Sequence, residues 1–353
     1  MLISIGILAR NEATRLEAAL VSLFSQTAIM SVDEIPSVQW EIIVVPNGCT
    51  DQTAVVARET LGRLVLAIAG NRISWKVCEL RDPGKSSAWN QFTHHLSSSQ
   101  AELLVLMDAD VVFGEPETLT HAVQALLADR TAVVAVARAL KDAHLKKTKT
   151  LVERVSLAAS AQSAFGPTDI SGMFYCGWAA PLRDIWMPAG LSVEDGFLYG
   201  MILTDCFRKP IDQRKVTLAP NASYYYRTLT SPRAIFRHEL RLVIGTTTNC
   251  YLMWDLLLFA TDPDGPGAGV MIRNLMANDP NWYPALVRNA IRNHGWWVLP
   301  RGMLFRRFSK LRPHFSWISV RRLAIAVIGF LFDLPVFLVA NSKLKRTDVI
   351  GYW

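Results

Sequence analysis

The sequence predicts an α/β fold with a mostly parallel central sheet. Within the first 140 residues, short apolar runs rich in β-branched residues alternate with stretches of helical periodicity. Runs that are apolar throughout are typical of strands buried on both faces, as parallel strands are in α/β proteins. The expected strands are residues 2–8, 40–45, 73–77, 103–107 and 132–137.

Helices are expected in the segments between these strands. Thr50-Asp51 is a cap signal, Pro83-Gly84 is a break before a new helix, and Glu115-Pro116 suits a first helical turn. The expected helices are residues 11–25, 51–64, 85–96 and 115–127.

The remainder of the chain has a different pattern. Residues 141–230 are expected to be mostly irregular, with a short strand at 216–219 and a helix at 195–207. From residue 231 onward the pattern is helical and increasingly apolar. We therefore expect one domain built on the sheet over residues 1–230 and a helical region over residues 231–353.

The composition excludes several classes of protein. Of the 353 residues, 51% are apolar and only 19% are charged, which excludes a disordered chain. The five cysteines are scattered, with no Cys-x-x-Cys, which excludes a disulfide scaffold or zinc ribbon and favours a reducing compartment. A strand-like run follows Met1 directly, without a signal-peptide pattern. A cytoplasmic location is expected.

The net charge of +7 is unevenly distributed along the chain. Residues 280–332 carry nine Lys and Arg residues and no acid, whereas residues 1–279 carry 25 basic and 28 acidic residues. The sequence thus joins a mildly acidic domain to a basic, apolar tail.

Polar residues follow four of the five expected strands, at 9–12, 46–51, 81–85 and 108–110. In parallel sheets, ligands bind outside the carboxyl ends of the strands. Asp108 and Asp110 follow a strand directly, and two carboxylates at this spacing suit one hard cation that shares its ligands with phosphates. The alternative for this pair is a solvated turn that caps the next helix.

Four motifs in order resemble those of the family 2 glycosyltransferases, which have the GT-A fold. They are ILARNEA at 7–13, EIIVVPNGCTDQT at 41–53, GKSSAWN at 84–90 and LMDAD at 106–110. A weaker resemblance continues through Ser171-Gly172 to Glu194-Asp195 and fades past residue 226.

The resemblance implies a nucleotide-sugar donor, expected to be a UDP-sugar, at these strand ends. It assigns the base and ribose to residues of the first two loops, and the pyrophosphate to Lys85, whose alternative is a surface lysine at a helix start. It assigns Mg²⁺ or Mn²⁺ to Asp110, with Asp108 on the ribose or the metal. The loop residues implied are Ala9, Arg10, Glu12, Asn47 and Asp51. The sequence departs from the usual Asp-Asp-Gly-Ser motif at 46–49, where it reads Pro-Asn-Gly-Cys.

For catalysis, the resemblance implies that Asp195 is the base and that Glu194 supports it. A single base without a covalent nucleophile implies inversion at the anomeric carbon. A helix N-terminus favours the ionised form of a carboxylate, which a base requires. The alternative for this pair is a Glu-Asp helix cap with no catalytic role.

Four further residues are expected near the acceptor or a phosphate, and each has a plainer alternative. Arg237 and Arg241 lie near the Gln/Arg-x-x-Arg-Trp motif of some membrane-associated members, although the Trp and Gln are absent; a solvated helix face is the alternative. Trp178 suits stacking on a sugar, with core packing as the alternative. Gly172 belongs to the weaker resemblance.

Residues 323–340 form an apolar segment of 18 residues that contains Asp333 and Pro335. Basic residues flank both ends, so we expect a helix broken near Pro335 that dips into the membrane or lies on it. A true span and a buried helix pair are the alternatives. The basic block suits an anionic membrane surface; nucleic acid is not expected, because no recognition motif is present.

The sequence therefore predicts a metal-dependent inverting glycosyltransferase, monotopic or peripheral, at the cytoplasmic face of the cell membrane. It transfers sugar from a UDP-sugar to a hydroxyl of a lipid acceptor: a glycolipid, a sphingolipid-like lipid or a polyprenyl-linked lipid. The alternatives are a polysaccharide glycosyltransferase and a non-catalytic nucleotide-sugar-binding protein. A dinucleotide-dependent dehydrogenase is excluded, because no G-x-G-x-x-G follows the first strand.

Overall fold

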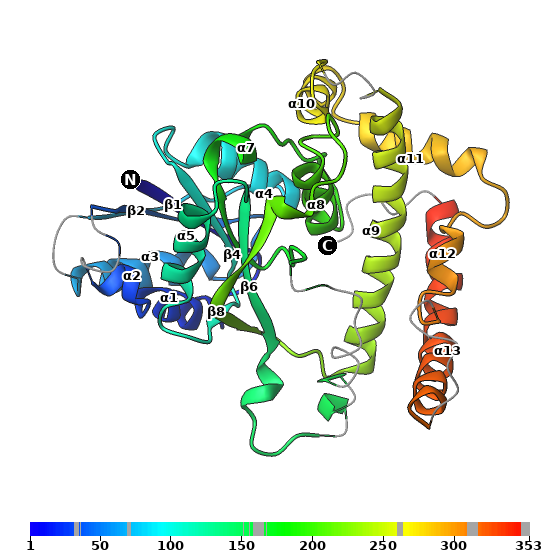
Figure 1. The fold of residues 1–353 in the computed structure, drawn as a ribbon, viewed down its shortest axis with the longest axis horizontal. Helices are drawn as coiled ribbons and strands as arrows, with labels where there is room; N and C mark the ends of the chain where they lie inside the picture. Colours follow the sequence, from blue (N-terminus) through cyan, green and yellow to red (C-terminus); the bar gives the residue numbers. More distant parts are fainter. Residues whose placement is uncertain are drawn as a thin grey trace.

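A central sheet with helices on both faces forms the body of the protein (Figure 1). The computed structural model describes residues 1–31, 35, 37–68, 72–150, 152–154, 156–157, 166, 168–259, 264–308 and 317–346. Within these residues the sheet has eight strands in the order β3-β2-β1-β4-β7-β6-β8-β5. The strands are β1 (Leu2–Ala9), β2 (Gln39–Pro46), β3 (Ile73–Val77), β4 (Leu103–Asp108), β5 (Val112–Phe113), β6 (Val134–Lys141), β7 (Phe174–Trp178) and β8 (Val216–Tyr226).

Strands β3, β2, β1 and β4 are parallel neighbours, which confirms the α/β fold that the sequence predicts. Side chains alternate between the two faces along each strand, and both faces are buried. Ile3, Ile5 and Ile7 pack on one face, while Leu104 and Leu106 pack on the other. This double burial explains why the sequence is apolar throughout in these strands.

Strands β7 and β8 correct the expectation of a mostly irregular segment over residues 141–230. Strand β7 lies antiparallel between β4 and β6, and β8 extends to Tyr226, beyond the short strand expected at 216–219. The aromatic residues Phe174, Tyr175 and Tyr224 are fully or almost fully buried. Tertiary packing, which local composition does not reveal, therefore decides the strand conformation here.

The helices divide between the two faces of the sheet. Helices α1, α3 and α5 share one hydrophobic core with the sheet, and α4, α7, α8, α9, α10 and α11 share the other. The helices of the first 230 residues are α1 (Leu16–Phe24), α2 (Thr27–Met30), α3 (Thr53–Leu66), α4 (Lys85–Gln91), α5 (Thr118–Ala128), α7 (Ala179–Arg183) and α8 (Glu194–Leu203). The C-terminal helices are α9 (Pro232–Phe259), α10 (Ala268–Asn278), α11 (Trp282–Asn293), α12 (Arg301–Leu304) and α13 (Trp317–Lys345).

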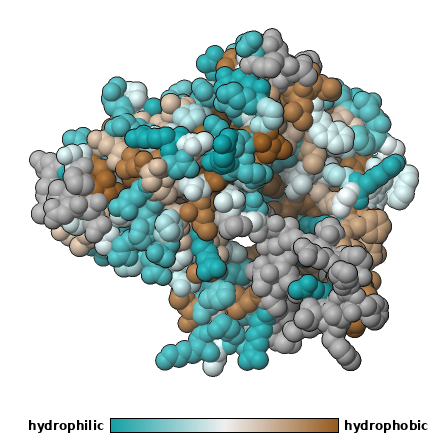
Figure 2. Space-filling model, in the orientation of Figure 1, coloured by the Kyte–Doolittle hydropathy of each residue, from teal (hydrophilic) through white to brown (hydrophobic). Residues whose placement is uncertain are grey.

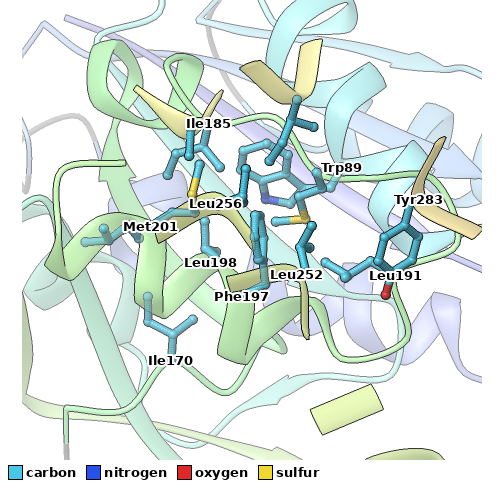
Figure 3. Close-up of a cluster of buried hydrophobic side chains, with 14 of the residues drawn as sticks. Trp89, Ile170, Ile185, Leu191, Phe197, Leu198, Met201, Leu252, Leu256 and Tyr283 are labelled. Carbon is cyan, nitrogen blue, oxygen red and sulfur yellow. The ribbon is translucent and has the colours of Figure 1, made fainter. Parts of the chain in front are cut away.

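The second core joins the C-terminal helices to the sheet domain. Figure 3 shows Trp89 of α4, Phe197 and Leu198 of α8, Leu252 of α9 and Tyr283 of α11 packed together. The division into 1–230 and 231–353 stays a prediction, since α9 and α8 share this core.

Helix α9 is held against the turn that precedes α8. The Nδ2 of Asn249 donates to the carbonyl oxygen of Val193 at 2.6 Å. A Cβ at Gly245 would lie 2.3 Å from Cγ2 of Val193, so the two backbones approach closely because residue 245 has no side chain. The position of Val193 fixes the start of α8.

Helix α13 is continuous from Trp317 to Lys345, which corrects the expectation of a break near Pro335. It lies beside α9 (Figure 1) and buries Val336, Phe337 and Ala340 there. An interior proline costs a helix one backbone hydrogen bond, and packing of the neighbouring turns keeps this helix intact across it.

Asp333 of α13 is the centre of a charged network. Its side chain is 1% exposed and pairs with Arg306 at 3.0 Å and with Arg307 at 2.9 Å. Arg306 also pairs with Glu239 of α9 at 2.8 Å. Two of the nine basic residues of the tail, Arg306 and Arg307, are thus paired with an acid within the protein. Lys310 and Arg312 lie outside the described residues.

Candidate nucleotide-sugar and catalytic site

The loops after β1 and β2 are joined at the carboxyl edge of the sheet. The backbone N–H of Glu12 donates to Oγ1 of Thr53 at 2.9 Å, and that of Ala13 donates to Oδ2 of Asp51 at 3.2 Å. Arg10 and Glu12 are half-buried, whereas Asp51 is exposed. The structure brings these three predicted residues together, and the carboxylate of Asp51 accepts one hydrogen bond from the first loop, that of Ala13.

Asn47 supports the loops from beneath the groove. Its side chain is 1% exposed; Nδ2 donates to the carbonyl oxygen of Ala9 at 3.0 Å, and Oδ1 accepts the N–H of Gly84 at 3.1 Å. The amide therefore ties the ends of β1 and β2 to the residue that precedes α4. Burial and these two bonds turn this side chain away from solvent, and a nucleoside contact at Asn47 stays a prediction.

Lys85 lies at the centre of the site. Its Nζ is 2.8 Å from Oδ1 of Asp108, 2.9 Å from Oε1 of Glu194 and 3.1 Å from the carbonyl oxygen of Gly172. An ammonium has three N–H donors, so these three acceptors use all of them. Burial lowers the pKa of Lys85, but the two carboxylates outweigh burial and raise it, so the lysine stays charged.

Gly172 allows this arrangement through its backbone. Its φ of +69° lies in the left-handed region, and a Cβ there would lie 3.0 Å from Cβ of Asp195 and 3.3 Å from Oε1 of Glu194. A side chain at this position would therefore disturb both carboxylates.

Glu194 and Asp195 begin α8 and differ in their surroundings. Burial raises the pKa of Glu194, but the Lys85 ammonium outweighs burial and lowers it. Burial, and then the neighbouring charge of Glu194, raises the pKa of Asp195 to about 6. Asp195 forms no ion pair with a described residue; its Oδ1 accepts the N–H of Gly196 at 2.7 Å. The pair thus consists of one clamped carboxylate and one that is available as a base.

Asp110, the carboxylate predicted to hold a cation, is half-buried and lies close enough to Glu12 for its charge to act on that residue. Burial, and then the charge of Asp110, raises the pKa of Glu12, so negative charge accumulates here. No three His, Cys, Asp or Glu side chains gather into a metal cluster within the described part of the chain. Mg²⁺ and Mn²⁺ that bind substrate phosphates need only one or two protein carboxylates, because phosphate and water supply the other ligands. The donor set therefore fits a cation shared with a diphosphate.

Two arginines of α9 differ in their relation to the acidic pair. Arg241 is half-buried, and its charge lowers the pKa of both Glu194 and Asp195, although burial and closer groups have larger effects. Arg237, one turn earlier, is exposed. The structure brings Arg241 to the site and leaves Arg237 further along the same helix.

Trp178 lies away from the site, which corrects the prediction of an acceptor contact. It pairs with Leu103 at the start of β4, whereas Asp108 ends that strand. Five residues of strand span about 17 Å. The guanidinium of Arg130 lies over the Trp178 ring at 4.4 Å, so the ring packs at the opposite edge of the sheet.

The floor of the site consists of residues that sequence reasoning missed. A small pocket beside Lys85 and the acidic pair is lined by apolar side chains that include Trp89 of α4, Tyr175 of β7, Leu198 of α8 and Met187 of the loop before α8. The indole N–H of Trp89 donates to the Tyr175 hydroxyl at 2.5 Å. Trp89 belongs to the motif at 84–90, but no local pattern indicates that Tyr175 lies beneath it.

Comparison with known proteins identifies related families and structures. Residues 4–182 match the family model described as Glycosyl transferase family 2. The mannosyltransferase PcManGT from Pyrobaculum calidifontis, solved with GDP-Man and Mn²⁺, is 16% identical with a TM-score of 0.52, over 99% of this chain and 87% of that chain. TarS 1–349 from S. aureus is 16% identical with a TM-score of 0.47, over 100% and 89% of the two chains. No curated protein sequence matches the chain.

The match to the family model covers half of the chain and includes the residues of the first four strand ends together with Gly172. The similarity to PcManGT over nearly the whole chain shows the GT-A fold. On these grounds the chain belongs to glycosyl transferase family 2.

Proposed function

We propose that the protein transfers a sugar from a UDP-sugar to a hydroxyl group of a membrane lipid, with inversion at the anomeric carbon. The observation that carries this proposal is that the two carboxylates at the start of α8 have different ionic partners. Lys85 clamps Glu194, whereas Asp195 forms no ion pair with a described residue and has a pKa raised to about 6. A general base needs a pKa near the operating pH and a free lone pair.

The donor lies over the joined loops of β1 and β2. Arg10, Glu12 and Asp51 line the side for the nucleoside, and the backbone of Ala9 is held in place by Asn47. Asp110 would hold a divalent cation, which would supply positive charge to the departing nucleoside diphosphate. Lys85 sets the positions of Asp108 and Glu194 instead of contacting phosphate, because its three N–H donors are already used.

The transfer step uses Asp195 as the proton acceptor. The acceptor oxygen forms a bond to the anomeric carbon while the carbon–phosphate-oxygen bond breaks and the electron pair leaves with UDP. The acceptor proton moves to the carboxylate of Asp195. A single displacement of this kind inverts the configuration. Arg241 keeps positive charge near the acidic pair, which favours the ionised base before the reaction.

We place the protein at the cytoplasmic membrane face with a lipid acceptor, and the apolar helix α13 supports the membrane part of this proposal. Within Arg322–Lys345 the most apolar window of 18 residues has a mean hydropathy of 2.5, and the helix is long and apolar enough by composition to cross a membrane. A polysaccharide acceptor is the second candidate function, because none of the described residues around Lys85 and the acidic pair requires a lipid.

A donor and acceptor screen tests the proposal. Purified protein with Mg²⁺ or Mn²⁺ is incubated with a panel of UDP- and GDP-sugars and a crude membrane lipid extract, and nucleoside diphosphate release is measured. We expect metal-dependent UDP release and a lipid product heavier by one sugar in mass spectrometry. Release that depends on an added polysaccharide supports the second candidate, and no turnover with any donor contradicts both.

A further inference from the structure

Helix α13 exposes a broad apolar face that no other described element covers. Its residues include Leu331 at 61% and Ile328 at 67% exposure, and only 28% of its most apolar window is buried. Figure 2 shows hydrophobic residues at the edge of the molecule where Figure 1 places α13. The exposed apolar residues are Val320, Leu323, Ile325, Val327, Ile328, Leu331, Phe332, Leu338 and Val339. A contiguous apolar face of this kind marks an interaction site.

We propose that α13 lies in the plane of an anionic bilayer, with this apolar face in the hydrocarbon and its other face on α9. This inference rests on the proposed function, to which it adds the manner of membrane binding. An apolar segment of this length also suits a membrane span or a buried helix pair; the geometry proposed is the one in the plane of the bilayer.

The opposite face of α13 is attached to the protein. Val336, Phe337 and Ala340 are fully buried, and Oδ1 of Asn341 accepts the N–H of Val298 at 2.8 Å. The helix therefore offers lipid one side only, as an interfacial helix does, whereas an isolated spanning helix is apolar all round.

The charged network at the middle of the apolar helix argues against a span. Asp333 lies midway along Arg322–Lys345, and it binds Arg306 and Arg307, with Glu239 attached to Arg306. A spanning helix with this packing would bring all four charged side chains to the bilayer midplane. Each charge there costs about 2.5–3.5 kcal/mol or more. In the in-plane geometry, the network stays on the protein side of the helix.

Charges at the two ends of α13 favour a single leaflet. Arg322 at one end and Lys345 at the other are exposed, and the one acid of the described helix, Asp333, is paired internally. A helix in the plane places both ends among the headgroups of one anionic leaflet, where each base near the surface contributes about 1 kcal/mol. A span would place one of them on the opposite side.

Liposome binding and topology test this geometry together. The full chain is added to preformed vesicles of phosphatidylcholine with or without phosphatidylglycerol, and binding is measured by flotation. We expect binding that increases at least tenfold with the anionic lipid. The double variant Ile328→Glu/Leu331→Glu is expected to lose at least tenfold of this binding, whereas Leu66→Glu, at an 89% exposed leucine on α3, retains it.

Topology is read with a membrane-impermeant maleimide applied outside the vesicles to Arg322→Cys and Ser342→Cys, each compared with the parent chain. We expect both new cysteines to react. Protection of one of them shows a span and overturns the proposal, as does failure of the parent chain to float. Donor turnover in detergent is measured on the same variants; if it persists while binding is lost, the enzymatic proposal stands independently of the geometry.

Discussion

Lys85 shows how one side chain organises the site at the residue scale. Its ammonium bridges the end of β4, the turn at Gly172 and the first residue of α8. The motif at 84–90 places a lysine at a helix start, which the sequence alone could predict. The sequence could not show that Asp108 and Glu194 converge on that lysine, because they are 86 residues apart and meet only in the folded chain.

Replacement of Lys85 by Met tests its positioning role. We expect kcat to fall on the order of 10²-fold, because displacement of the acidic pair by about 1 Å is enough for such a loss. The affinity for UDP, measured by calorimetry, is expected to change much less than kcat. An affinity loss as large as the loss in kcat would instead show that Lys85 binds the diphosphate.

The pH profile reports on Asp195. Its carboxylate must be deprotonated to act as base, so kcat/KM is expected to fall as the pH drops below about 6. Glu194→Gln removes the neighbouring negative charge, which lowers the pKa of Asp195 and moves the acidic limb to lower pH. An unchanged or upward-shifted limb in this variant would show that another group controls the profile.

At the scale of elements, α9 couples the C-terminal helices to the catalytic turn. The periodicity from residue 231 predicts helices correctly, and the apolar strands predict the parallel half of the sheet. Strand β7, antiparallel to β4 and β6, and most of β8, parallel to β6, are missed, because they form through contacts between residues distant in sequence. Helix α13 is continuous where proline predicts a break, since a packed face outweighs one lost hydrogen bond.

Gly245→Ala tests the approach of α9 to the turn at Val193. The new Cβ would lie 3.1 Å from the backbone nitrogen of Val193 and closer still to its side chain, so the helix or the turn must move. We expect the free energy of unfolding to decrease by about 1–3 kcal/mol. We also expect kcat to fall by about 10-fold or more, because the acidic pair follows directly.

Gly302→Ala serves as the matched control, since its Cβ would meet open space. Equal kcat values for the Gly245→Ala and Gly302→Ala proteins would show that α9 does not position the acidic pair.

At the scale of the whole molecule, the Asp333 network joins α13, the segment after α12, and α9. The sequence shows Asp333 as an interruption of an apolar run and the basic block as a free positive surface. The structure pairs Asp333 with two of these bases, which the sequence could not reveal because the partners are 26 and 27 residues away.

Asp333→Leu is expected to lower the free energy of unfolding in detergent by about 1–3 kcal/mol. This is less than the loss for a fully buried pair, because the two arginines are 31% and 34% exposed and partly screened. Chemical denaturation measures the difference. Asp333→Leu combined with Arg307→Met is expected to recover part of the loss, and an additive further loss would contradict the pairing.

The whole account depends on Asp195 as the base of a nucleotide-sugar transfer reaction. The most direct measurement is UDP release and lipid-linked product formation by the parent protein, Asp195→Asn and Glu59→Gln, an exposed control on α3. We expect the Asn variant to retain UDP binding and metal dependence and to lose at least 10²-fold in product formation, with the control unaffected and the product inverted at the anomeric carbon. Product formation by Asp195→Asn at the rate of the control, or a product of retained configuration, would contradict the account.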